Sequence, residues 1–66
     1  MTKISTEFIT LTQFLKMEDF ISSGGEAKIF LSQYPVFIND ETENRRGKKL
    51  YKNDKIEINK KIFVIE

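Results

Sequence analysis

The chain lacks cysteine and histidine altogether, and only one proline and three glycines occur among its 66 residues. Without cysteine no disulfide can stabilise the fold, and without cysteine or histidine a zinc site built from the usual ligands is excluded. We therefore expect no metal site and no cofactor. The absence of cysteine also agrees with a reducing compartment, so we expect a cytoplasmic protein.

Long hydrophobic runs are missing as well, the longest being residues 62–65. A membrane-spanning helix needs about 20 apolar residues, so we expect neither a membrane span nor the core of a signal peptide. Catalytic patterns are equally scarce, since the acidic pairs Glu18-Asp19 and Asp40-Glu41 are sequence neighbours that do not face each other across a cleft. No Gly-x-Ser-x-Gly motif occurs. We expect no enzymatic activity and no small-molecule substrate.

The net charge of +1 conceals an uneven distribution of charge. Residues 1–44 carry three lysines against seven acidic residues, whereas residues 45–66 carry eight basic residues against three acidic ones. Residues 45–49, Arg-Arg-Gly-Lys-Lys, form what we call the basic loop. A charge run is most often a solvated surface. This one lies between two apolar segments, and a loop held by a folded frame suits phosphate better than a flexible tail.

The first amphipathic segment predicts a short helix near the N-terminus. Leu11, Phe14 and Leu15 have the i, i+3, i+4 spacing of one buried helix face, and Met17 extends it. Thr12 is the predicted N-cap, because its hydroxyl can accept from a free amide of the first turn.

A second helix is predicted to follow residues 23–26, Ser-Gly-Gly-Glu, which have the spacing of a capping box. In that motif the serine side chain bonds the N3 amide, and the glutamate side chain bonds the serine amide. The predicted buried stripe comprises Ala27, Phe30 and Leu31. Pro35 ends the helix, because the residue before a proline is driven out of the helical region.

The rest of the chain predicts strands joined by tight turns. Apolar alternation favours strands over residues 36–38, 56–58 and 62–65. The turn signals are Asn39-Asp40, Asn53-Asp54 and Asn59-Lys60. Two helices followed by a small antiparallel sheet indicate an α+β fold. We expect a single domain over residues 1–66, with its core at about 9–65.

This order of a capped basic helix, an apolar strand ending in Asn39-Asp40 and a basic loop resembles the S4 RNA-binding domain, and in particular the stand-alone, YaaA-like S4 proteins of bacteria. The resemblance implies an S4-like (αL) fold with two short helices packed on a small antiparallel sheet. It also implies a non-catalytic protein that binds structured RNA, with ribosomal RNA as the expected target, in association with ribosomes or their assembly. Residues 36–40 match the Val-x-Val-Asn-Gly pattern of the family except for Asp40. Residues 10–12, Thr-Leu-Thr, stand where many S4 domains have Arg-Leu-Asp, so the RNA contact of that arginine is not expected here, and the Arg45-Arg46 pair is a candidate to supply the charge instead.

The basic loop is the main candidate for RNA contact. Arginine binds phosphate bidentately and lysine acts as a mobile point charge, while Gly47 is expected to adopt positive φ and let the loop curl against a phosphate. Gly24 and Gly25 leave backbone amides uncovered at a helix start, and the resemblance places a basic residue at Lys28. The predicted RNA-binding set is Lys16, Ser23, Gly24, Gly25, Lys28, Asn39, Arg45, Arg46, Lys48 and Lys49.

Each of these assignments has a structural alternative. The glycine pair can merely permit the turn between helices, Lys28 can serve solubility, and Asn39 can be a turn former. The alternative function is a protein-interaction module whose basic loop binds an acidic partner surface, and DNA binding is a third possibility. In either case we expect a monomer.

Overall fold

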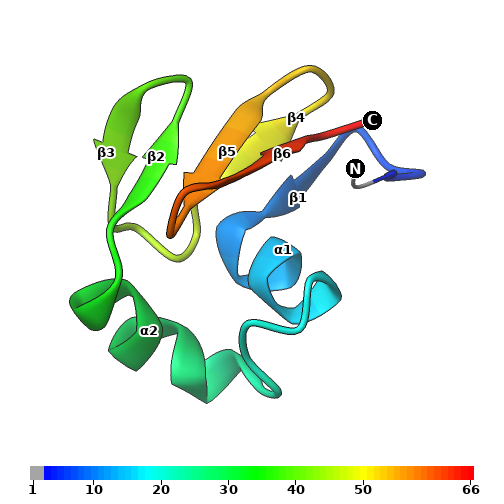
Figure 1. Ribbon diagram of the computed structural model, residues 1–66. Coiled ribbons are helices and arrows are strands. Elements are labelled where there is room, and N and C mark those ends of the chain that lie inside the picture. The colour runs from blue at the N-terminus through cyan, green and yellow to red at the C-terminus, as the bar shows by residue number, and fades with distance from the viewer. Residues whose placement is uncertain (1–2) are drawn as a thin grey trace.

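The computed structural model describes residues 3–66, in which a strand precedes two helices and five strands follow them (Figure 1). The elements in chain order are β1 (Phe8–Thr10), α1 (Leu11–Met17), the 3₁₀ helix η1 (Gly24–Glu26), α2 (Ala27–Gln33), β2 (Val36–Ile38), β3 (Glu41–Glu43), β4 (Lys49–Tyr51), β5 (Lys55–Ile58) and β6 (Lys61–Val64). The helices lie together below the strands in Figure 1. The predicted α+β class is confirmed.

The strands form two antiparallel sheets rather than one. β1 pairs with β4, and the other four strands are ordered β3-β2-β5-β6. In the larger sheet Val36 lies opposite Ile58, and Ile38 lies opposite Ile56. All four side chains are buried, because residues two apart on a strand point to the same face of the sheet. The sheet therefore presents one apolar face to the core.

The predicted hairpin turns are present. Asn39 and Asp40 have φ values of 52° and 71°, and Asn59 and Lys60 have φ values of 51° and 68°. Positive φ at both central residues matches the twist of the two strands that a two-residue turn joins. Asparagine and aspartate tolerate this conformation better than other residues with a Cβ. The two turns close the β2–β3 and β5–β6 hairpins, of which the sequence predicts the second, whereas for the first it predicts the turn but not the strand β3.

Both helices bury the predicted faces. Leu11, Phe14 and Leu15 are fully buried on α1, and so is Ala27 on α2. Half-buried residues of the second helix pack beside them, namely Phe30 and Leu31. Met17 is 49% exposed, because six residues after Leu11 a helical side chain points to another side. Within residues 3–66, neither helix has the length and apolar character to cross a membrane.

The predicted N-cap of the first helix is wrong. The cap is Thr10, whose Oγ1 accepts from the Gln13 amide at 3.2 Å. The Gln13 side chain in turn accepts from the Thr10 amide at 2.8 Å, which completes a capping box. Thr12 lies inside the helix, and its hydroxyl is free for another partner.

The reciprocal capping box predicted for residues 23–26 is also wrong. Ser23 makes no capping bond to a backbone amide. Instead the Glu26 carboxylate accepts from the Ser22 amide and from both serine hydroxyls. These hydrogen bonds, that of the Ser22 side chain first, lower the pKa of Glu26. The acid therefore still fixes the start of η1, but through the residue before the predicted cap.

Candidate functional site

The basic loop connects β3 to β4, and its backbone is fastened to the first turn of α1. The Leu11 amide donates to the Lys48 carbonyl at 2.8 Å, and the Thr12 amide donates to the Arg46 carbonyl at 3.0 Å. The Thr12 hydroxyl donates to the same Arg46 carbonyl at 2.9 Å. Amides that lack a partner inside the helix thus bind carbonyls of the loop. The first turn of α1 therefore holds the loop by its carbonyl groups and uses none of the side chains of the loop.

The side chains of Arg46 and Lys48 take no part in these contacts with α1. Among residues 3–66, neither Arg46 nor Lys48 has a side-chain hydrogen bond or ion pair to another residue. Arg46 is exposed and Lys48 is half-buried. Their charges can therefore bind a ligand without breaking a hydrogen bond or ion pair of the fold. The hydrogen bond from Arg45 and, more weakly, the charge of Lys48 lower the pKa of Glu43.

Arg45 is oriented by an acid instead. Its Nε lies 2.9 Å from Oε2 of Glu43, and its second guanidinium nitrogen lies 3.2 Å from Oε1. The Arg45 side chain is 71% exposed, whereas that of Glu43 is only 11% exposed. The hydrogen bond from Arg45 lowers the pKa of Glu43 to about 2. The bidentate pair fixes one edge of the guanidinium and leaves the rest open to solvent.

Lys49 opens β4 and lies over an aromatic ring. Its Nζ is 4.8 Å from the centroid of Phe8 on the neighbouring strand, within cation–π distance. Phe8 also contacts Tyr51 at a centroid distance of 5.8 Å. Lysine and tyrosine are thus two residues apart on the same face of β4.

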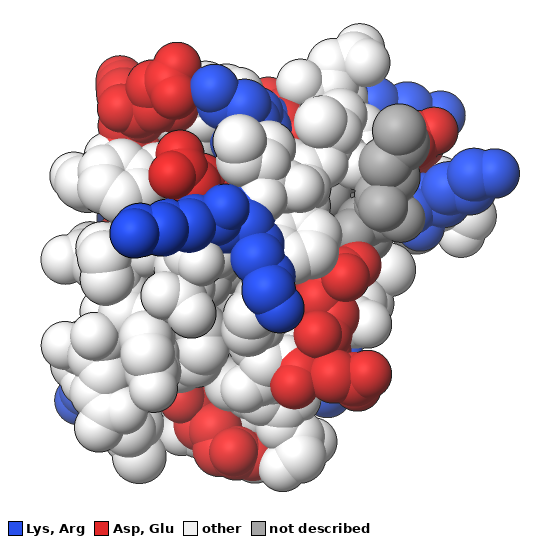
Figure 2. Space-filling model, in the orientation of Figure 1, with Lys and Arg blue, Asp and Glu red and all other residues white. Residues whose placement is uncertain are grey.

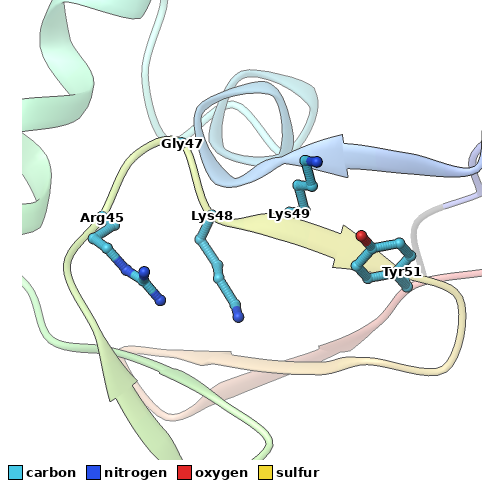
Figure 3. Close-up of a pocket in the computed structure, with 5 residues that line it drawn as sticks. All are labelled: Arg45, Gly47, Lys48, Lys49 and Tyr51. Carbon is cyan, nitrogen blue, oxygen red and sulfur yellow. The ribbon is translucent and has the colours of Figure 1, made fainter.

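Residues of the basic loop line several hollows of the surface. The first has a volume of about 420 Å³, and Arg45 and Lys48 extend side by side from the loop with Lys49 and Tyr51 on the strand beyond (Figure 3). The second hollow is lined by Lys28, Leu31, Asn44, Arg45, Arg46 and Gly47. The structure therefore brings Lys28 of α2 to the basic loop. We call the basic loop and Lys28 together the basic face.

Gly47 differs from the prediction. Within residues 3–66 no glycine has positive φ. A Cβ placed on Gly47 would meet nothing within 4 Å. The loop geometry is set by the α1 contacts described above, not by a glycine-specific backbone conformation.

The other predicted site residues lie at different distances from the basic face. A Cβ on Gly24 would lie 3.8 Å from Cγ2 of Thr12, the residue that holds the loop, while Gly25 is exposed beside it. Lys16 is exposed in the last turn of α1, at the opposite end from those contacts. The Ser23 hydroxyl is engaged with Glu26.

Asn39 lines a further hollow of about 480 Å³ that Arg45 and Lys48 also line, but its side chain is used within the fold. Its Nδ2 donates to Asp54 Oδ1 at 3.1 Å, and its Oδ1 accepts from the Lys55 amide at 2.9 Å. Asp54 Oδ2 accepts in turn from the Tyr51 amide at 2.8 Å. These bonds favour the turn-forming interpretation of Asn39.

Two residues that shape the site escaped sequence reasoning. Thr12 acts across 34 positions of sequence, and no local pattern indicates such a contact. Glu43 stands two residues before Arg45, and this short acid–base spacing is the signal that would have found it.

The face seen in Figure 2 has a different character. Basic and acidic side chains are interspersed there, and an uncharged area extends over α2 at the lower left. Two large apolar residues are strongly exposed, Ile29 on α2 and Ile62 on β6, each at 60%. Within the described residues, no three acidic side chains are grouped as metal ligands.

Comparison with known proteins places this geometry in a family. A family model described as an S4 domain matches residues 2–66. The chain belongs to the S4 domain family. This S4 chain is 62% identical over 55 residues to the "Probable ribosome maturation protein RlbA" of Bacillus subtilis (strain 168), and the aligned region covers 83% of this chain and 78% of that protein. No solved structure gave a significant match. The family predicted from the sequence is confirmed.

Proposed function

We propose that this S4 protein binds structured ribosomal RNA through its basic face and acts in ribosome maturation. The observation that supports the proposal is that the fold uses the backbone of the basic loop and leaves two of its basic side chains available. Its carbonyls are bound by α1, and the Arg46 and Lys48 side chains make no hydrogen bond or ion pair among residues 3–66. Ordering the loop on binding then costs little conformational entropy, because the loop backbone is already held in place.

The relative supports the same process. RlbA is named as a probable ribosome maturation protein, and 62% identity over most of both chains makes a shared role the simplest expectation. The charge of the basic face favours an anionic partner, because Lys28 and residues 45–49 together supply five cations. We place this activity in the cytoplasm, without catalysis and without a cofactor.

Recognition on this surface is expected to depend on phosphate positions and RNA shape. Arginine can hold a phosphate with two parallel hydrogen bonds, while lysine adapts to an irregular backbone. A-form RNA offers its phosphates and 2′-hydroxyls but hides its base edges in a narrow major groove. Gly24 and Gly25 extend the proposed contact beside Thr12, and Lys16, Ser23 and Asn39 are its peripheral members.

The proposal is tested by equilibrium binding to a hairpin taken from ribosomal RNA. Four to six phosphate contacts predict a log–log salt slope of about −4 to −5, at about 0.9 per contact. Scrambling the hairpin sequence while keeping its fold should change the affinity little, whereas unfolding the hairpin should weaken binding strongly. Tight binding to unstructured strands with a shallow slope and strong base preference would contradict the proposal.

The alternative partner, an acidic protein surface, gives a different result in one experiment. Ribosomal particles are captured from cell extract with the tagged full chain, with and without prior nuclease treatment. RNA binding predicts that nuclease abolishes capture. Capture that survives complete digestion of the RNA would favour a protein partner for the basic face.

A further inference from the structure

The two-stranded sheet has an outer face of its own beside the basic loop. In the β1–β4 register Ile9 lies opposite Leu50, and Phe8 lies opposite Tyr51. Ile9 and Leu50 are buried in the core. Because successive side chains of a strand alternate between faces, Phe8 and Tyr51 lie on the other side, where Lys49 also contacts Phe8. A short sheet thus carries two aromatic rings and a cation outward.

The Tyr51 ring is held in place without being covered. Its ring packs against Phe8 at 5.8 Å between centroids with the planes tilted by 50°. Its backbone is closed into a turn, with the Tyr51 amide donating to Asp54 Oδ2 at 2.8 Å and the Asp54 amide donating to the Tyr51 carbonyl at 3.1 Å. The residue nevertheless remains 44% exposed. Tyr51 therefore offers a fixed, half-open aromatic surface.

This surface borders the hollow that Arg45 and Lys48 enter (Figure 3). Tyr51 is the aromatic residue among the five that line it. The hollow measures about 420 Å³, within the roughly 300–1,000 Å³ of small-ligand sites. Cations that can hold a phosphate thus lie next to a ring on which a base can stack, which is the pairing that single-stranded nucleotides require.

We propose that Tyr51 stacks on one unpaired base of the bound RNA while Arg45 and Lys48 hold the phosphates beside it. A ring cannot reach a base inside a continuous A-form duplex, so the base must be splayed from a bulge or loop. This inference rests on the proposed function and narrows its substrate. The preferred RNA is a helix interrupted by an unpaired nucleotide.

Tyrosine fluorescence can report on binding, because the chain contains two tyrosines and no tryptophan. Tyr34→Phe leaves Tyr51 as the sole tyrosine, and Tyr51→Phe leaves Tyr34. The two are matched controls, since each is 44% exposed, but Tyr34 lines none of the hollows at the basic loop. The probes are a fully paired RNA hairpin and the same hairpin with one bulged adenosine. Tyrosine emission of the Tyr34→Phe variant should fall on binding the bulged hairpin and change little with the paired one. Emission of the Tyr51→Phe variant should change with neither.

Affinity provides the second measurement. Tyr51→Leu should weaken binding of the bulged hairpin by about 5- to 150-fold, the range for one base stacked on an aromatic ring. It should leave the paired hairpin unaffected, and Tyr34→Leu should affect neither. Equal binding of both hairpins with no loss of Tyr51 emission would overturn the stacking inference and leave RNA binding intact. Failure of the parent to bind either hairpin at low salt would overturn the proposed function and this inference together.

Discussion

Two irregular segments between strands are held in opposite ways. One is the basic loop, and the other is the turn junction formed by Asn39 and Asp54. At the turn junction the side chains hold the structure, because Asn39 binds both Asp54 and the Lys55 amide, and Asp54 binds the Tyr51 amide. In the basic loop the carbonyls of Arg46 and Lys48 are held by α1. The side chains of Asn39 and Asp54 are occupied by hydrogen bonds of the fold. Those of Arg46 and Lys48 make no hydrogen bond or ion pair among residues 3–66. The comparison thus separates the polar residues into a structural group and a binding group.

The largest effect is expected from Asp54→Ala at the turn junction. It removes hydrogen bonds to both carboxylate oxygens, at about 2–3 kcal/mol in total. For so small a protein the melting temperature should fall by roughly 10–20 °C, measured by circular dichroism. Glu41→Ala, which removes an exposed carboxylate of β3, is the control and should change the melting temperature little. Equal melting temperatures of the two variants would show that the hydrogen bonds of Asp54 do not stabilise the fold.

Thr12→Val tests how the basic loop is held, because it removes the hydroxyl that binds the Arg46 carbonyl and keeps the shape of the side chain. The loss of one hydrogen bond should cost about 0.5–1.5 kcal/mol. A less ordered loop should also bind the RNA hairpin about two- to threefold more weakly, although no charge is removed. Thr42→Val on exposed β3 is the matched control. Unchanged stability and affinity would show that the loop is held by other contacts.

The ion pair of Glu43 with Arg45 should make the stability of the protein depend on pH. Its pKa is lowered from 4.5 to about 2, mainly by the hydrogen bond from Arg45. A lowered pKa in the folded state means that the carboxylate stabilises the protein above pH 4.5 and loses this effect as the pH falls to about 2. The melting temperature of the parent should therefore exceed that of Glu43→Gln at neutral pH, and the difference should shrink over this interval. A difference that does not vary with pH would contradict the ionised pair.

The smallest effect is expected from Gly47→Ala. Gly47 has no positive φ, and a Cβ at this position meets no atom within 4 Å. Replacing a glycine at a compatible position stabilises by about 0.4–1 kcal/mol through the unfolded chain. Melting should be unchanged or slightly raised, and RNA affinity should stay the same. A clear loss of stability would restore the positive φ predicted from the sequence.

Local patterns predicted the parts of the fold that depend on neighbours in sequence. The Asn39-Asp40 and Asn59-Lys60 turns, the α2 stripe and its end before Pro35 follow from such patterns. β3 was missed because Glu-Thr-Glu has no apolar alternation, and it becomes a strand only by pairing with β2. The charges of the candidate site were visible in the sequence. Their anchoring was not, because the contact of Thr12 with Arg46 exists only after the chain has folded.

The central claim is that the side chains of Arg46 and Lys48 serve binding and not folding, and one paired measurement tests it most directly. The melting temperature and the dissociation constant for the ribosomal RNA hairpin are determined for Arg46→Ala/Lys48→Ala and for Lys60→Ala/Lys61→Ala. The second variant removes two equally basic charges from the exposed β5–β6 hairpin.

The account predicts nearly unchanged melting for both double variants. The loop variant alone should lose affinity, and its salt slope should become shallower by about 2, one step for each phosphate contact removed. Equal affinity of the two variants, or a loop variant that melts well below the parent, would contradict the account.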